Sequence, residues 1–167
     1  MAEIIDIYDE NRVFTGRSVE RGTFLNEGEF MLNILAIIQN AEGKFLITQR
    51  SMDKSWGAGW WEVPGGGVSA GETTSTSIVR EVAEEVGLDV SGEELNVLYN
   101  YTNVDLKHGS NYIVDIFGFA LDFDESDVVL QAEEVMGFKL ATWEEIEEIA
   151  ERGEFLHFAR IRTALGK

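Results

Sequence analysis

Residues 66–88 constrain the chain more than any other stretch, because a glycine-rich turn passes directly into a helix. Pro64 and the three glycines after it predict the turn, since neither a strand nor a helix tolerates such a run in its interior. Residues 73–75, all threonine or serine, can cap the start of a helix, and Gly87 offers the left-handed residue that ends many helices. We therefore expect a turn followed at once by a helix.

The expected helix has two distinct faces when its residues are placed about 100° apart. The apolar face would pack on a core and contains Ile78, Val79, Val82 and Val86. The neighbouring face spans roughly 100° and contains Glu81, Glu84 and Glu85. Clustered carboxylates repel one another, and hard oxygen ligands suit Mg²⁺ or Mn²⁺. Two interpretations stay open, a solvated acidic face or a metal site. The adjoining glycines favour the metal site, because they let the backbone approach a ligand closely.

This stretch resembles the Nudix box, the sequence motif of the Nudix hydrolase family. The motif reads Gly, five residues, Glu, seven residues, Arg-Glu, an aliphatic residue, any residue, Glu-Glu, any residue, Gly and an aliphatic residue. Every fixed position is filled here, by Gly66, Glu72, Arg80, Glu81, Val82, Glu84, Glu85, Gly87 and Leu88. A match this long and dense is far more specific than a lone short glycine motif.

The resemblance implies a role for each residue of the motif. The metal ligands and catalytic carboxylates would be Glu81, Glu84 and Glu85. The carbonyl of Gly65 would be a further Mg²⁺ ligand. Arg80 would be a catalytic residue that orients the carboxylates, and it would pair with Glu72. The structural residues of the motif would be Gly66, Glu72 and Gly87.

A second acidic segment, residues 131–135, precedes a predicted short strand at 137–140. Members of the Nudix family often have a further acidic residue in a loop at this place, where it binds metal or acts as the base. The matching candidates are Glu134, as a metal ligand, and Glu133, as a substrate contact. A solvated acidic loop is the alternative, and the identity of the general base stays open.

Side chains outside the motif are candidates for binding substrate. Arg50 ends a predicted strand, where it could contact a phosphate or be an ordinary surface charge. Three tryptophans precede the glycine turn: Trp56, Trp60 and Trp61. Tryptophan is mostly a core residue, but one of the three, with Trp60 as the candidate, could stack on a base. We expect His108 in a solvated loop and His157 packed within the C-terminal helical segment.

The composition excludes several classes of function. A formal net charge of −18 argues against nucleic acid and anionic membranes as partners, although a bound divalent cation would reverse the field near a small phosphorylated substrate. The absence of cysteine excludes disulfides, zinc–thiolate sites and thiol nucleophiles. The most apolar run, 34–38, is too short to span a bilayer, and the start of the chain shows no secretory signal. We expect a cytoplasmic protein.

The flanks of the motif predict strands on both sides of the central helix. Beyond an N-terminal hairpin, the strands are expected at 31–39, 44–50, 95–101 and 112–120, with the first two of these forming a hairpin. A helix should begin at a capping box, 142–145, and break at Gly153. The length fits a single domain over 1–167, with the hairpin of residues 1–29 packed on it. The pattern predicts an α+β fold, and the resemblance implies a Nudix-type α/β/α sandwich with a mixed β-sheet.

The resemblance implies a Mg²⁺-dependent hydrolase that cleaves a diphosphate bond in a nucleoside diphosphate linked to another moiety. Homodimers are frequent in the family. Two alternatives remain open. The N-terminal flank resembles the branch related to isopentenyl diphosphate isomerase, which acts on a non-nucleotide diphosphate but uses a catalytic cysteine that this chain lacks. A non-catalytic nucleotide-binding sensor is the other alternative, although a degenerate box would be expected there.

Overall fold

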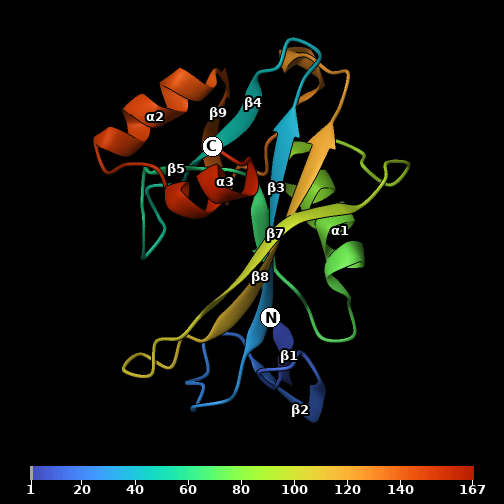
Figure 1. Cartoon of the computed structure of the whole chain (residues 1–167), viewed down its shortest axis with the longest axis vertical. Coiled ribbons are helices and arrows are strands. Elements are labelled where there is room, and N and C mark those ends of the chain that lie inside the picture. Colours follow the sequence, from blue (N-terminus) through green and yellow to red (C-terminus); the bar gives the residue numbers. More distant parts are fainter. Residues whose placement is uncertain (1) are drawn as a thin grey trace.

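A computed structural model describes residues 2–167 of the chain, which form a mixed sheet between helices (Figure 1). The strands are β1 (Ile4–Tyr8), β2 (Phe14–Glu20), β3 (Met31–Gln39), β4 (Phe45–Arg50), β5 (Trp61–Glu62), β6 (Gly65–Gly67), β7 (Asn96–Asn103), β8 (Tyr112–Ala120) and β9 (Val135–Ala141). The helices are α1 (Thr74–Val86), α2 (Trp143–Glu151) and α3 (Phe158–Ala164), and a single 3₁₀ turn covers Glu125–Asp127.

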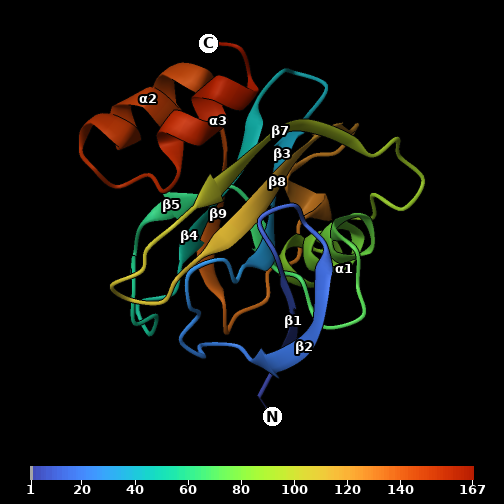
Figure 2. The same ribbon diagram turned by 60° about the horizontal axis from the view of Figure 1, so that its bottom comes forward.

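The main sheet has the strand order β5-β4-β3-β8-β7, with β6 also paired to β3 and β9 also paired to β4. Strand β3 runs parallel to β8 and antiparallel to its other partners. Figure 2 shows α1 on one side of this sheet and α2 and α3 on the other. Each side has its own apolar core, one containing the buried residues of α1 and the other those of α2 and α3. The predicted α+β fold with a mixed sheet is confirmed.

The pairing of β3 with β4 departs from the simple hairpin that the sequence predicts. The two strands pair only next to their turn, at Gln39 and Phe45, and then separate. Beyond that point β3 pairs with the glycine strand β6, while β4 pairs with β5 and β9. The separation of two adjacent strands opens the middle of the sheet toward α1.

Helix α1 begins and ends as its sequence predicts. Thr73 is the N-cap, with its side chain accepting from the backbone N–H of Thr76 and the Thr76 hydroxyl accepting from the backbone N–H of Thr73. Gly87 ends the helix in the left-handed conformation, with φ of 72°. The apolar face is buried, since Ile78 and Val82 have no exposed surface. At α2 only half of the predicted capping box forms: Thr142 accepts from the N–H of Glu145, but the Glu145 carboxylate pairs with Lys139.

The glycine run after Pro64 is a strand, which corrects the prediction of a turn. Strand β6 pairs antiparallel with β3, placing Gly65 opposite Leu35 and Gly66 opposite Ile34. The glycines are required by crowding. A Cβ on Gly65 would lie 2.4 Å from the carbonyl oxygen of Ile34, closer than any real contact allows. The sequence signal for a tight turn was therefore a signal for close approach of two backbones.

Substituting Gly65 by Ala is expected to lower the free energy of unfolding by about 1–3 kcal/mol, because the added Cβ must push β6 away from β3. Gly92→Ala is the matched control, since a Cβ there meets nothing within 4 Å. Urea denaturation of both variants measures the difference. Equal stabilities would contradict the crowding explanation.

The N-terminal strands β1 and β2 pair antiparallel at the end of the sheet where β3 begins (Figures 1 and 2). Ile5, Ile7 and Leu25 form a small buried cluster there. Arg12, in the turn of this hairpin, reaches the buried Asp115 of β8 through two hydrogen bonds of 2.7 and 2.8 Å. The hairpin is thus held on the sheet by apolar contacts, by the Arg12–Asp115 ion pair and by backbone hydrogen bonds of Tyr8 with Phe30 and of Ile4 with Ala70. Within residues 2–167, no helix has the length and apolar character needed to cross a bilayer.

Candidate functional site

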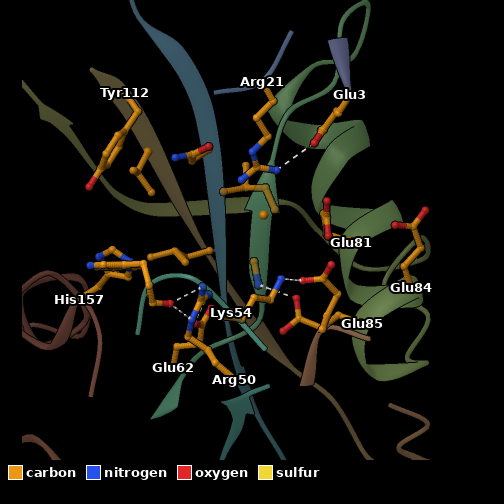
Figure 3. A pocket seen from close by; sticks show the side chains of 18 of the residues that line it. Glu3, Arg21, Arg50, Lys54, Glu62, Glu81, Glu84, Glu85, Tyr112 and His157 are labelled. Carbon is orange, nitrogen blue, oxygen red and sulfur yellow. Dashed lines mark hydrogen bonds and ion pairs between the residues drawn. The ribbon is translucent and has the colours of Figure 1, made fainter. Parts of the chain in front are cut away.

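A cavity of about 910 Å³ lies where β3 and β4 separate. Figure 3 shows its two walls. Glu81, Glu84 and Glu85 of α1 form one wall, which we call the acidic wall, and Tyr112 and His157 stand on the opposite side. Between the two walls lie Arg50, Lys54 and Glu62. The cavity therefore joins an acidic surface to an aromatic one.

Arg80 is the centre of the ion-pair network on α1. It donates two hydrogen bonds to Glu72, at 2.8 and 2.9 Å, which ties the helix to the loop that precedes it. The guanidinium group lowers the pKa of the Glu72 carboxyl. A third nitrogen of Arg80 donates to Glu81 at 3.0 Å and to Glu84 at 3.1 Å. Arg80 thus orients two of the three carboxylates, the arrangement that the motif implies.

Glu85 is the most buried acidic group of the cavity, with 6% of its surface exposed. Its carboxylate accepts long hydrogen bonds from the Thr48 hydroxyl (3.3 Å) and from the Gly65 N–H (3.4 Å). Burial, followed by the nearby charge of Glu62, raises the pKa of Glu85 from 4.5 to about 8. At neutral pH and without a cation, this carboxyl group is mostly protonated.

Burial also raises the pKa of Glu81 and of Glu62. Gly66 makes room for Glu81, because a Cβ on this glycine would lie 2.5 Å from the Glu81 carboxyl carbon. Glu62 of β5 receives a hydrogen bond of 2.9 Å from Arg50, and its charge contributes to the raised pKa of Glu85. Glu62 is not among the candidates predicted from the sequence, although a lone carboxylate within the apolar run Trp60–Val63 could have indicated a functional residue.

These acidic groups fit a divalent cation by their chemistry. The donors are all oxygens, and three of them belong to carboxyl groups whose pKa is raised by burial, so that a bound cation would stabilise their charged form. Arg80 donates hydrogen bonds to one oxygen of Glu81 and one oxygen of Glu84. Residues 2–167 contain no group of three acidic, histidine or cysteine side chains already arranged to hold a metal ion. The carboxylates would have to turn from Arg80 toward a bound ion.

Only some of the other predicted site residues line the cavity. Arg50 lines the cavity, but it is already paired with Glu62 and with the carbonyl of Trp56. Glu134 also lines the cavity and forms an ion pair with Lys54. Two candidates are not among the lining residues: Trp60 and Glu133. Trp56, from the same loop as Trp60, is the tryptophan that lines the cavity.

His157 is placed differently from its prediction. It precedes α3 in a left-handed backbone conformation, with φ of 61°, and its ring lines the cavity beside Tyr101. Burial lowers the pKa of His157, and the charge of Arg50 lowers it further. His108 is exposed, as expected, and its ring pairs with Asp105 at 2.9 Å at the edge of the cavity.

The raised pKa of Glu85 predicts how stability depends on pH. The folded protein holds a proton that the unfolded chain releases near pH 4.5, so the stabilisation is complete below that pH and is lost as pH rises through about 8. In EDTA, we expect the free energy of unfolding to fall between pH 6 and pH 9, and to fall less in Glu85→Gln. Urea denaturation at the two pH values measures this. A variant with the same pH dependence as the wild type would contradict the assignment.

Comparisons with known proteins agree with this geometry. The NUDIX domain family matches residues 29–161. An uncharacterised Nudix hydrolase of Listeria monocytogenes is 34% identical over 156 residues, which cover 92% of this chain and 88% of that protein.

Among solved structures, a Deinococcus radiodurans protein superimposes with a TM-score of 0.72 at 20% identity and 91% coverage of both chains. A bifunctional NMN adenylyltransferase/ADP-ribose pyrophosphatase of Francisella tularensis, complexed with AMP and a manganese ion, superimposes with a TM-score of 0.65 at 21% identity, covering 82% of this chain and 41% of that one. The resemblance of the motif, the matched domain and the shared fold agree, and the chain belongs to the Nudix hydrolase family.

Proposed function

We propose that this protein is a Mg²⁺-dependent hydrolase that cleaves the diphosphate bond of a nucleoside diphosphate linked to another moiety. The observation that carries the proposal is the wall of buried carboxylates, Glu81 and Glu85 with Glu62 beside them, on one side of a cavity large enough for a nucleotide. The Francisella relative in fold, which was solved with AMP and manganese, supports the same class of ligand and ion.

The ion would be held by Glu81, Glu84 and Glu85, with the Gly65 carbonyl and Glu134 as the further candidates. A bound Mg²⁺ or Mn²⁺ supplies charge neutralisation for the phosphoryl oxygens and lowers the pKa of a water molecule. The carbonyl and carboxylate oxygens named here are the ligands that these ions prefer.

The chain's own residues would orient the reacting groups. Arg80 ties α1 to the preceding loop through Glu72, and it holds Glu81 and Glu84 next to the cavity until an ion binds. A carboxylate of the acidic wall would accept the proton of the attacking water. Glu134 is a second candidate for this role, and it forms an ion pair with Lys54. Arg50 and Lys54 lie between the two walls, where the diphosphate would bind (Figure 3).

A screen for metal-dependent cleavage tests the proposal. The full-length protein would be incubated with Mg²⁺ or Mn²⁺ and with nucleotide sugars, dinucleotides, nucleoside di- and triphosphates, and isopentenyl diphosphate. We expect released phosphate or nucleoside monophosphate from a nucleoside diphosphate derivative, and none in EDTA. Cleavage of isopentenyl diphosphate alone would favour a non-nucleotide substrate. Binding without any cleavage would favour a sensor.

A further inference from the structure

Strand β7 is an edge strand of the main sheet and has no partner on its outer side (Figure 2). It pairs antiparallel with β8 along one edge, and within residues 2–167 no backbone hydrogen bond reaches the other edge. Helix α3 contacts a face of the strand rather than this edge, with Arg160 lying 4.3 Å from the centre of the Tyr101 ring. The outer N–H and C=O groups of β7 are therefore free to pair with another chain.

The features that usually protect an edge strand are missing from β7. Natural edge strands commonly carry a proline or a charged side chain, most often lysine, which prevents a second strand from pairing. Neither a proline nor a charged residue occurs within Leu95–Val104. By contrast, β9, which pairs only with β4 in the described part of the chain, carries Lys139. One bulge follows Val97, and from Tyr99 to Asn103 the register with β8 is regular.

Apolar side chains are exposed at both ends of β7. Leu95 and Val97 are exposed at its start, and Val104 and Leu106 are exposed directly after its end. Apolar side chains that gather on one edge indicate an interaction surface, whereas singly scattered ones do not. An antiparallel copy of the strand runs in the opposite direction, so that the start of one copy lies beside the end of the other. The apolar ends of two copies would therefore meet twice.

The charges that flank β7 are complementary in the same arrangement. Glu93 and Glu94 precede the strand, and Lys107 follows it. Asp105 also follows it, but its carboxylate is paired with His108 at 2.9 Å. Antiparallel pairing of two copies places the acidic start of one strand near the lysine of the other. Two chains with a net charge of −18 each repel one another, and this uncharged edge with complementary ends opposes their contact least.

We propose that two copies of this chain pair through β7, antiparallel and about a two-fold axis, so that their main sheets form one continuous sheet. The two-fold axis makes the contact reciprocal and closes the assembly as a dimer. Asn96 and Asn100 are exposed along the strand and suit this contact, because an amide can both donate to and accept from an identical amide. The proposal does not depend on hydrolysis, since no residue of the acidic wall takes part in the contact.

Sedimentation velocity of the full chain tests the proposal. An eight-residue strand with its flanking side chains makes a small interface, and we expect a dimer that dissociates at about 10–100 µM. The sedimentation coefficient should rise with concentration from that of a monomer to that of a dimer, and no further. A chain that stays monomeric at about 500 µM would overturn the proposal and leave the edge to a strand of another protein. Growth beyond a dimer would also overturn it.

Two valine variants test whether β7 is the surface involved. Val97→Lys introduces the side chain that protects natural edge strands, and we expect it to weaken association about tenfold or more. Val13→Lys is the matched control, because it adds the same charge at an exposed valine in the N-terminal hairpin. Its association should be at least as strong as that of the wild type. Equal association of the two variants would overturn the assignment to β7.

Single cysteines would locate the two-fold axis, since the chain has no cysteine of its own and a disulfide must join two copies. In an antiparallel pair only the residue next to the axis lies opposite itself, at the distance that a disulfide needs. Asn96→Cys, Asn100→Cys and Thr102→Cys would be oxidised in parallel, with Val13→Cys as the exposed control. We expect one of the three to form far more dimer than the control. Equal cross-linking of all four variants, or none in the three of β7, would overturn the pairing.

Discussion

Replacing Glu85 by Gln is expected to lower kcat by about 10³-fold, equivalent to about 4 kcal/mol of transition-state stabilisation. Glu85 is the most buried carboxylate of the acidic wall, and the negative charges of Glu62 and Glu81 act on it. A cation held there would lose a charged ligand and the negative field that attracts it. The effect should therefore appear in turnover and in metal affinity together.

The same substitution should leave the fold intact. With a pKa of about 8, the Glu85 carboxyl is already neutral at pH 7 when no cation is bound, and a glutamine amide has nearly the same shape. Its oxygen can still accept from the Gly65 N–H, as the carboxylate does. We expect the metal-free variant to melt at or above the temperature of the wild type. The rise in melting temperature on adding Mg²⁺ should be lost.

Glu147→Gln is the matched control, because it removes one negative charge from an exposed position of α2, away from the cavity. Its kcat and its Mg²⁺-dependent melting temperature should equal those of the wild type. If Glu85→Gln retains full turnover and the full Mg²⁺ effect, the ion is bound elsewhere, and the acidic wall has another role.

The local structure of α1 could be predicted from the sequence because its signals lie within one stretch of chain. The Thr73 cap, the Gly87 end and the buried Ile78 face all depend on neighbours within a few residues. The pairing of Arg80 with Glu72 followed from the motif. Strand existence was also predictable, since β3, β4, β7 and β8 match the apolar patterns.

Pairing between strands could not be predicted in the same way. The strand character of Gly65 depends on how closely Ile34 approaches it, and a sequence pattern carries no such distance. Likewise, β3 pairs with β4 at one residue pair only, because β6 pairs along the same edge of β3 while β8 occupies the opposite edge. Long-range competition of this kind is what decides the shape of the cavity.

The missed site residues share one feature. Glu62 and His157 each lie in a segment with strong apolar character, whose pattern predicts packing in the core. Their partners are distant in sequence: the charge of Glu62 acts on Glu85, and His157 contacts Tyr101. A polar residue within an apolar strand costs free energy unless it is paired or used. That cost is the signal that could have identified both residues.

Replacing Arg12 by Ala should lower the free energy of unfolding by about 2–3 kcal/mol, a large share of the total for a single domain. The exposed fraction of the Asp115 side chain is 4%, and Arg12 pairs with it through both carboxylate oxygens. Removing the arginine leaves a carboxylate buried in the middle of β8 without its cation. The Arg12 side chain is 37% exposed, so water can partly replace it, which limits the loss.

Arg17→Ala is the matched control in the same hairpin. Arg17 pairs with Glu29, but the arginine side chain is 47% exposed and the glutamate is accessible too, and such surface pairs are worth about 0–1 kcal/mol. Urea denaturation of the two variants separates a buried ion pair from a surface one. A loss of equal size in both would mean that Asp115 is satisfied without Arg12.

The double variant Arg12→Met/Asp115→Leu identifies what Arg12 contributes. If the cost of Arg12→Ala comes from an unpaired carboxylate, removing the carboxylate as well should recover most of the stability, because apolar residues can replace a buried ion pair with little loss. If the arginine instead holds the hairpin in place, the double variant should stay destabilised and β1 and β2 should lose protection from hydrogen exchange. We expect recovery, because Ile5, Ile7 and Leu25 already bury an apolar contact beneath the hairpin.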